Sequence, residues 1–322
     1  MPDPRADSPL SESLPDNSLY VESALEIRTD AIVAEVHGAS GAPGDAVKRR
    51  LGFGFWLAIA WLVLMTFLAA FGPMLPLDDP TDFVGKSKES FSSDHWLGTD
   101  KLGRDLLSRT VSGTRISLIV GIAAVAGGLL VGGTIGLIAG FRRGWFERTS
   151  MAGGDILLSF PAVVLALAIV SFRGRDLWDI VLTLFILSVA PILRLTRANS
   201  LQWSQREFVQ ASRVLGAKDS TILRREVLPN VLMPMASLAL VGVAIVIVAE
   251  GTLAFLGLGI QTAFGVDDPI SWGKMVLEGS KDLETAPHIA FVPATALFLT
   301  VLALNFAGDK IRGHFDVRES SL

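Results

Sequence analysis

Few residues in this sequence could bind a metal ion, and those few lack the neighbouring ligands that a metal site needs. Four of them lie close together in one polar segment: Asp94, His95, Asp100 and Asp105. Zinc sites combine cysteine and histidine at short ligand spacings, and calcium sites combine several carboxylates in one loop. Neither a paired histidine spacing nor a Glu-rich helix accompanies these residues. We therefore predict no metal site here.

Nucleotide binding and covalent catalysis are not supported either. The run Gly85-Lys86-Ser87 resembles the end of a phosphate-binding loop, but the first glycine of that motif would fall on Pro80. The chain has no cysteine, which excludes disulfides and thiolate chemistry. Its four histidines lie outside the apolar segments or at their ends: His37, His95, His288 and His314. We predict no catalytic residue and no cofactor bound by this chain.

Two carboxylates lie within apolar segments and are candidates for a transport path or gate. Asp155 is close to the start of its segment, where the dipole of a helix favours a carboxylate. Glu250 lies roughly 30 Å along its helix from residue 231, close to the far boundary of a bilayer. Acids in membranes usually face a bundle interior or a water-filled cavity. For Glu250, pairing at the rim of the membrane is an equal alternative.

The elements that must position these residues are long apolar runs. Half of the 322 residues are hydrophobic and the mean hydropathy is +0.49. A membrane-spanning helix needs about 20 mainly apolar residues, and irregular backbone cannot face lipid. We therefore predict an all-α integral membrane protein whose six transmembrane helices cover 52–73, 115–140, 151–172, 178–197, 231–257 and 288–308.

The distribution of basic residues predicts the orientation. If the N-terminus is cytoplasmic, 18 of the 28 Lys and Arg residues lie in cytoplasmic segments and 10 in external ones. Basic residues favour the cytoplasmic side. Both termini are therefore expected to be cytoplasmic, in a multi-pass protein of a prokaryotic plasma membrane.

This orientation divides the chain into five parts. Residues 1–47 hold nine acidic residues and two arginines, so we expect 1–50 to be a disordered cytoplasmic tail, with Leu19–Val36 as a candidate weak amphipathic helix. No signal peptide is predicted, and the first span should act as an uncleaved anchor. The remaining parts are this anchor (51–73), an extracytoplasmic segment (74–114), a core of five transmembrane helices (115–308) and a cytoplasmic C-terminal tail (309–322).

A basic polar segment from Arg194 to Asn230 separates two apolar runs, and within it lies the loop 198–229. Phe208, Ala211 and Leu215 follow helical spacing and predict one apolar face of a short surface helix. Gly216 should end that helix in the left-handed conformation. Asp219 or Ser220 could cap a second short helix, and Pro229 suits the first turn of the next long one.

Glycines mark the second span and the external segments. Every fourth residue of the second span is glycine, which favours close helix packing: Gly128, Gly132, Gly136 and Gly140. Pro191 should bend the fourth span. Gly98, Gly103 and Gly113 are typical of turns and caps. Trp272, in the long external loop 260–287, suits an interfacial belt or a docking surface.

Together these features resemble the C-type permease of the dipeptide, oligopeptide and nickel group of binding-protein-dependent ABC importers. The resemblance covers residues 91–308. The motifs that carry it are the run from His95 to Leu118, Asp155 with Phe160-Pro161, the run from Glu250 to Gly259, and Ser271-Trp272-Gly273.

The loop between the fourth and fifth spans matches the signature of these importers with three departures. The signature is Glu-Ala-Ala, three residues, Gly, nine residues, then Ile-x-Leu-Pro. Gln210 replaces the acidic residue, Ser212 the second alanine and Glu226 the isoleucine, although Glu207 lies one turn earlier and could supply a charge. The resemblance implies the type I importer permease fold and a coupling helix that docks on an ATPase through Glu207, Phe208, Gln210, Ala211, Ser212, Leu215 and Gly216.

The resemblance further implies a heterodimer with a homologous permease, two cytoplasmic ATPase subunits that use ATP-Mg, and an external solute-binding protein, with no role for nucleic acid. Peptide is the expected substrate, and nickel or another small solute is the alternative. Two other classes stay open. A stand-alone secondary transporter should show internal repeats and intramembrane charge. An intramembrane enzyme should show a buried nucleophile and base.

Overall fold

The computed structural model describes residues 52–319. The predicted disorder of residues 1–50 and the candidate helix Leu19–Val36 lie outside the described residues. The described part is mostly helical, and its one sheet is a two-stranded hairpin formed by β1 (Thr262–Ala263) and β2 (Val266–Asp267). The predicted all-α fold class is confirmed.

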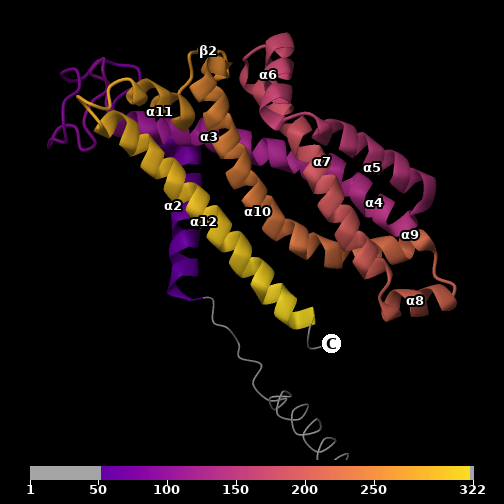
Figure 1. Cartoon of the computed structure of the whole chain (residues 1–322). Helices are drawn as coiled ribbons and strands as arrows, with labels where there is room; N and C mark the ends of the chain where they lie inside the picture. Colours follow the sequence, from indigo (N-terminus) through magenta and orange to yellow (C-terminus); the bar gives the residue numbers. More distant parts are fainter. Residues whose placement is uncertain (1–51, 320–322) are drawn as a thin grey trace, which may run out of the picture. The chain divides into compact units, whose positions relative to one another are not determined.

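The helices follow one another as a membrane bundle (Figure 1). In chain order they are α2 (Phe53–Phe71), a 3-10 turn (Gly72–Met74), α3 (Leu106–Gly128), a π-helical turn (Leu129–Gly133), α4 (Thr134–Arg142), α5 (Gly144–Ser159), α6 (Ala162–Arg173), α7 (Leu177–Ser204), α8 (Glu207–Val214), α9 (Asp219–Ile222), a second π-helical turn (Leu223–Val227), α10 (Leu228–Leu253), a third π-helical turn (Ala254–Leu258), α11 (Trp272–Ser280) and α12 (His288–Glu319).

Five helical stretches within residues 52–319 are long and apolar enough to cross a membrane: Phe53–Met74, Leu106–Arg142, Leu177–Ser204, Asp219–Leu258 and His288–Gly313. The pair α5 and α6 supplies a sixth crossing if the two helices act as one broken span. The six predicted spans therefore agree with the structure when α5 and α6 are counted as one broken span.

The third predicted span, 151–172, is not one helix. α5 ends at Ser159, α6 begins at Ala162, and the two axes are bent by 88°. Phe160 is extended (φ −89°, ψ 137°), because a proline at the next position disfavours the helical conformation. Pro161 therefore interrupts the span rather than being accommodated within it.

Two helices extend beyond the predicted spans. α3 begins at Leu106, within the segment expected to be external, because the Asp105 carboxylate caps it by accepting a 2.7 Å hydrogen bond from the Ser108 amide. Gly113 therefore lies inside a helix, whereas Gly98 and Gly103 adopt positive φ angles in turns as predicted. α12 continues to Glu319, well into the expected C-terminal tail.

The bundle has a main core between α3, α7 and α10, where Val120, Ile180 and Ile247 are almost fully buried. Trp272 also belongs to this core and is not exposed at all, so its predicted role in an interfacial belt or docking surface is wrong. Its indole N–H donates to the Thr110 carbonyl at 3.0 Å. α11 thus packs against the start of α3.

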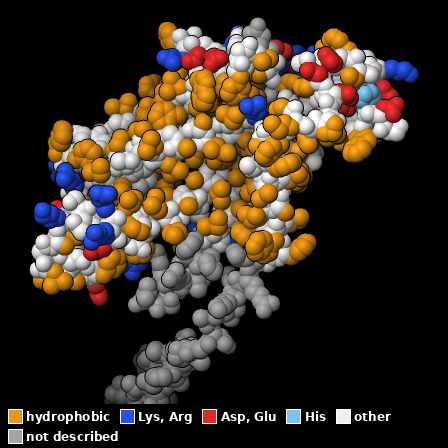
Figure 2. All heavy atoms as spheres, turned by 180° about the vertical axis from the view of Figure 1, so that it is seen from behind, with side chains coloured by type: hydrophobic (Ala, Val, Ile, Leu, Met, Phe, Trp, Pro, Cys, Tyr) orange, Lys and Arg blue, Asp and Glu red, His pale blue; other side chains and the backbone are white. Residues whose placement is uncertain are grey.

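The two ends of the bundle differ. α7 leads into α8, and α10 returns from α9, so α8 and α9 lie at one end; α11 and the β hairpin lie at the other (Figure 1). Hydrophobic side chains cover much of the visible flank, and Lys and Arg side chains gather near α5, α8 and α9 (Figure 2). We call these the α8 end and the α11 end.

Candidate functional site

α8 is a short helix held at the α8 end by one buried side chain. Val209 is fully buried in a small apolar cluster that includes Phe141 from α4 and Ile222 and Val227 from the segment after α8. The opposite face of α8 is largely exposed, and on it the Phe208 ring lies 6.3 Å from that of Trp203 on α7. The sequence analysis missed Val209, because Phe208, Ala211 and Leu215 show the clearer helical spacing and yet lie on the other face.

The outward face carries the residues that were predicted to dock on a partner. Glu207, Gln210 and Ala211 are exposed, Phe208 is 43% exposed and Leu215 is 86% exposed. Val214, which was not predicted, is 88% exposed. Large apolar side chains on a short exposed helix are typical of a surface that another protein covers.

The backbone around α8 largely follows the sequence pattern. Gly216 has φ +81°, the left-handed conformation that ends a helix. Pro229 lies in the first turn of α10. Neither Asp219 nor Ser220 caps α9, because Asp219 is already its first helical residue and Lys218 precedes it without a side-chain cap.

Two residues that depart from the importer signature contact each other. The Ser212 hydroxyl donates a 2.7 Å hydrogen bond to Oε1 of Glu226, which lies in the π-helical turn before α10. The other carboxylate oxygen of Glu226 is buried without a hydrogen-bond partner among the described residues. The Gln210 amide also donates to the Ser204 carbonyl at 3.3 Å. α8 is thereby tied to both α7 and α10.

The four predicted packing glycines lie where the α3–α4 stretch crosses α7. A Cβ atom at Gly132, Gly136 or Gly140 would lie 2.5 Å from the carbonyl oxygen of Val189, Leu193 or Arg197 respectively. A Cβ atom at Gly128 would lie 2.8 Å from the Ile192 side chain. The two backbones therefore meet along this line, and only a hydrogen atom fits between them.

The two candidate gate residues have different surroundings. Asp155 on α5 is exposed and forms a 2.5 Å ion pair with Arg194 on α7. Glu250 is 1% exposed, and Oε1 of its carboxylate accepts a 2.8 Å hydrogen bond from Ser271 just before α11. Oε2 of Glu250 has no hydrogen-bond partner within residues 52–319. Glu250 thus joins α10 to α11 rather than extending to the surface, and the structure does not bring the two acids together.

Comparison with known proteins decides the family. Residues 132–320 match the family described as binding-protein-dependent transport system inner membrane component. The chain belongs to this family. It is a permease subunit of an ABC importer and a multi-pass protein of the inner membrane.

Curated relatives and solved structures agree with this assignment. The glutathione transport system permease protein GsiD of Pectobacterium atrosepticum is 38% identical over 276 residues, covering 85% of this chain and 89% of that protein. GsiD of Escherichia coli O1:K1 / APEC is 39% identical over 225 residues, covering 70% and 73%. An inward-facing MetNI methionine ABC transporter structure has a similar fold, with a TM-score of 0.54, 19% identity, and 64% and 96% coverage.

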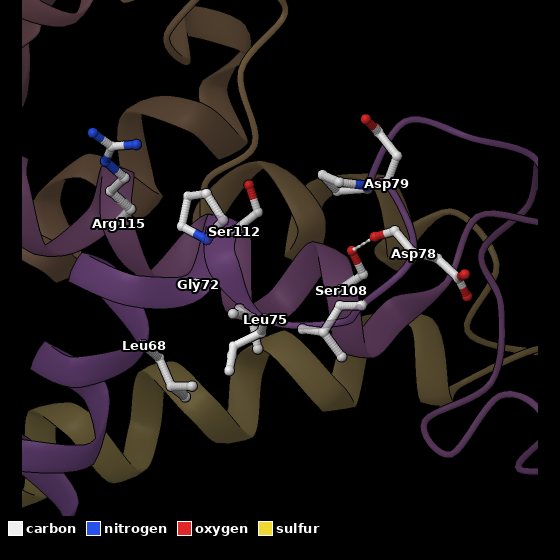
Figure 3. A pocket seen from close by; sticks show the side chains of 12 residues that line it. Leu68, Gly72, Leu75, Asp78, Asp79, Ser108, Ser112 and Arg115 are labelled. Atoms are coloured by element: carbon white, nitrogen blue, oxygen red, sulfur yellow. Dashed lines mark hydrogen bonds between the residues drawn. The ribbon is translucent and has the colours of Figure 1, made fainter.

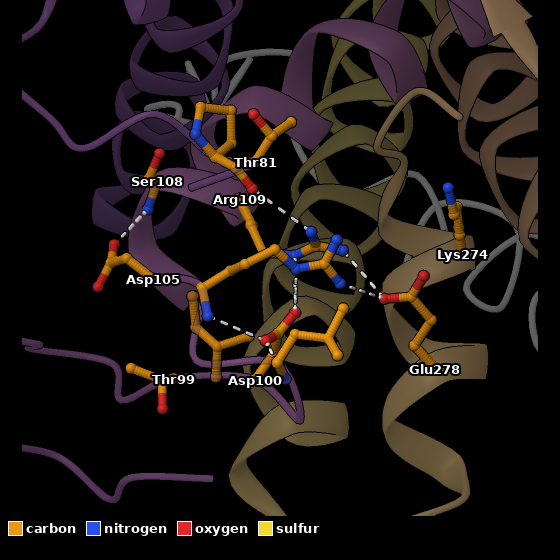
Figure 4. A network of polar contacts seen from close by, with 12 residues as sticks. Thr81, Thr99, Asp100, Asp105, Ser108, Arg109, Lys274 and Glu278 are labelled. Carbon is orange, nitrogen blue, oxygen red and sulfur yellow. Dashed lines mark hydrogen bonds and ion pairs between the residues drawn. The ribbon is translucent and has the colours of Figure 1, made fainter. Parts of the chain in front are cut away.

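The α11 end of the permease contains a buried ionic network that the sequence analysis missed (Figure 4). Arg109 is 1% exposed and lies 2.9 Å from the Glu278 carboxylate on α11 and 3.6 Å from that of Asp100. Arg104 donates to the same Asp100 oxygen at 2.6 Å. The Asp100 carboxylate, one of the candidate metal ligands in the sequence, thus pairs with two guanidinium groups.

The other suspected metal ligands also have protein partners. His95 lies 3.3 Å from Asp105, the cap of α3. The structure contains, within residues 52–319, no group of three or more His, Cys, Asp or Glu side chains arranged for a metal ion. The acidic and histidine residues of this segment fold it onto α3 and α11. Arg109, an arginine within a helix of small and apolar residues, is the sequence feature that could have indicated this ionic network.

A small pocket of about 340 Å³ lies at the same end, between the end of α2 and the start of α3 (Figure 3). Ser108 donates to the Asp78 carbonyl in its wall, and Arg115 stacks 5.2 Å from the centre of the Phe264 ring. Hydrogen bonds from the hydroxyl and amide of Thr81 hold the pKa of Asp79 below its usual value. Asp79 therefore stays ionised near neutral pH at the rim of this pocket.

Proposed function

We propose that this permease forms half of the transmembrane path of an ATP-driven importer for peptides. Its partners would be a homologous second permease, two cytoplasmic ATPase subunits that bind ATP-Mg, and an external solute-binding protein that delivers the peptide. This chain binds no nucleotide and performs no covalent chemistry in the proposal. Membership in the importer family supports the general assembly.

The exposed face of α8 is the observation that carries the coupling role. Phe208, Val214 and Leu215 face outward from a helix that Val209 anchors on the other side. The hydrogen bond between Ser212 and Glu226 and the packing of Val209 connect α8 to the start of α10. A force on α8 would therefore reach a membrane-spanning helix directly, as coupling requires.

We place the α8 end in the cytoplasm. The excess of basic residues in the segments at this end supports that orientation. Residues 1–50 and the end of α12 would then be cytoplasmic, and the segment 74–114 and the loop 260–287 would be external. The buried ionic network of the α11 end would stabilise the surface that receives the solute-binding protein.

The names of the relatives support a peptide as the substrate. Two relatives that cover at least 70% of this chain are called glutathione transport permeases, and glutathione is a short peptide. Import of nickel or another small solute is the alternative within the same family. A stand-alone secondary transporter is the second alternative, and it requires no docking at α8.

The test is a charge placed on the docking face. Ala211→Asp adds volume and an unpaired carboxylate to the exposed face of α8, whereas the control Ala211→Ser adds a single hydroxyl. Leaving a buried polar group without a partner costs about 1–3 kcal/mol, or roughly five- to 150-fold in an interface equilibrium. We expect Ala211→Asp, but not Ala211→Ser, to release the ATPase subunits during purification and to abolish peptide uptake in proteoliposomes. Normal retention and uptake with Ala211→Asp would reject docking at α8 and favour the stand-alone transporter.

A further inference from the structure

A second pocket lies at the α8 end, where the ends of α4 and α7 meet α8. Its volume is about 650 Å³ and its wall is mainly polar. Arg142 and Arg143 contribute from the end of α4, Arg213 from α8, and Asp219 from the start of α9. Three guanidinium groups against a single carboxylate make this pocket suited to an anion.

The three arginines of this pocket have no ion-pair partner among residues 52–319. Neighbouring arginines on α7 are paired, Arg194 with Asp155 and Arg197 with Glu147. Across residues 52–319, by contrast, no carboxylate forms an ion pair with Arg142, Arg143 or Arg213. The Arg213 guanidinium instead lies 5.3 Å from the centre of the Phe141 ring, which holds it over the end of α4.

The sequence around the pocket favours a position near lipid headgroups. Arg142 is the last residue of the apolar stretch Leu106–Arg142, so the pocket opens where that span ends. Trp145, three positions later, is 77% exposed. Exposed tryptophan is typical of the boundary between bilayer and water, and basic pockets between transmembrane helices at this level bind anionic headgroups. These two markers favour a lipid over an acidic segment of a partner protein.

We propose that this pocket binds the phosphate of an anionic phospholipid headgroup. Arg142 and Arg143 hold the phosphate from α4, and Arg213 reaches it from α8. Gln205 and Gln210, which also line the pocket, offer amide N–H donors to the glycerol or headgroup oxygens. Asp219 disfavours a second anion, so one headgroup fills the site.

The bound lipid would tie α8 to α4. Without it, α8 is joined to the bundle through the burial of Val209, the hydrogen bonds from Ser212 to Glu226 and from Gln210 to Ser204, and the contact between Arg213 and Phe141. A phosphate shared by α4 and α8 would fix the angle at which α8 leaves the bundle. This consequence for coupling rests on the proposed function, but the binding of the lipid does not.

The experiment measures binding of a fluorescent phosphatidylglycerol to the purified whole complex in detergent, with phosphatidylcholine and inorganic phosphate as competitors. Each arginine near an anionic lipid surface contributes about 1 kcal/mol, or roughly fivefold in affinity. We expect Arg142→Gln, Arg143→Gln and Arg213→Gln each to weaken binding about fivefold. The matched control is Arg148→Gln, which removes the same charge from an exposed position on α5 outside the pocket.

Phosphatidylcholine should fail to compete, and inorganic phosphate should compete only far above the lipid concentration. Unchanged lipid affinity in the three variants, or an equal loss in Arg148→Gln, would overturn the proposal. Competition by inorganic phosphate at the lipid concentration would show that the site binds free phosphate, which contradicts a lipid site. Loss of ATPase subunits with unchanged lipid affinity would identify the pocket as a partner contact and reject it. Because Arg213 lies on a different helix from Arg142, misfolding at the end of α4 cannot mimic the full pattern.

Discussion

The glycine line between α4 and α7 allows a test in which two neighbouring glycines should respond in opposite directions to the same substitution. A Cβ atom at Gly136 would lie 2.5 Å from the Leu193 carbonyl oxygen and 2.9 Å from Cβ of Thr196. A Cβ atom at Gly133, in the adjoining π-helical turn, has only Thr196 Oγ1 within reach, at 4.0 Å. Alanine at Gly136 therefore clashes with backbone, and alanine at Gly133 does not.

The expected magnitudes follow from these distances. A carbon and a carbonyl oxygen in ordinary contact lie well beyond 3 Å apart, so Gly136→Ala must separate α4 from α7, and such overpacking costs about 1–3 kcal/mol. Gly133→Ala should stabilise by about 0.5–1 kcal/mol, because alanine loses less conformational entropy than glycine in a helix. The two variants should thus differ by about 1.5–4 kcal/mol in the free energy of unfolding.

The assay is thermal unfolding of the detergent-purified permease. The folded fraction that remains at each temperature is measured by size-exclusion chromatography. Gly133→Ala should unfold at or above the temperature of the unmodified protein, and Gly136→Ala clearly below it. Gly132→Ala should resemble Gly136→Ala, since its Cβ would lie 2.5 Å from the Val189 carbonyl oxygen. If Gly136→Ala and Gly133→Ala unfold at the same temperature, the two helices do not meet through backbone at this line.

Three further predictions concern the two ends of the bundle. Arg109→Met should lower the free energy of unfolding by about 1–3 kcal/mol, because Asp100 and Glu278 each keep Arg104 but lose their second guanidinium partner, and unchanged thermal unfolding would contradict this. Ser212→Ala should speed amide hydrogen exchange in α8, because the partly buried Glu226 carboxylate then has no hydrogen-bond donor and the local stability of α8 falls by about 1–3 kcal/mol. The double variant Ser212→Ala with Glu226→Leu removes the unpaired carboxylate and should recover part of the protection from exchange. In intact cells an impermeant thiol reagent should label Val266→Cys and spare Ala217→Cys, and the opposite pattern would reverse the proposed orientation.

The sequence predicts the spans well, because a helix that crosses a bilayer needs a long run of apolar residues, and such runs are visible in the composition. Uncharged runs such as 231–257 have no economical conformation in lipid other than a helix, and α10 with its π-helical continuation occupies that run. The helix ending before Gly216 could also be predicted, since its left-handed conformation leaves a local signal. The bend at Pro161 could have been predicted as well, because the restriction that proline places on Phe160 is local.

Features that depend on contacts between distant residues could not be predicted in this way. Trp272 looks the same in sequence whether it faces headgroups or fills the space beside Gly113, where a Cβ atom would lie 3.1 Å from the indole. Ser212 and Glu226 read separately as two departures from a signature, and only the structure makes them a hydrogen-bonded pair. Val209 was overlooked because helical spacing identifies apolar faces without saying which one the bundle covers.

The interruption between α5 and α6 restricts where lipid can be in the assembled importer. The last carbonyls of α5 cannot find partners one turn further on, because the helix stops at Ser159. Ser159, Phe160 and Pro161 are exposed on this chain. Hydrocarbon cannot solvate an open peptide group, and the bilayer would expel such a break unless protein or water covered it. At hydrocarbon depth this corner therefore has to be covered by protein or water, and lipid tails cannot contact it.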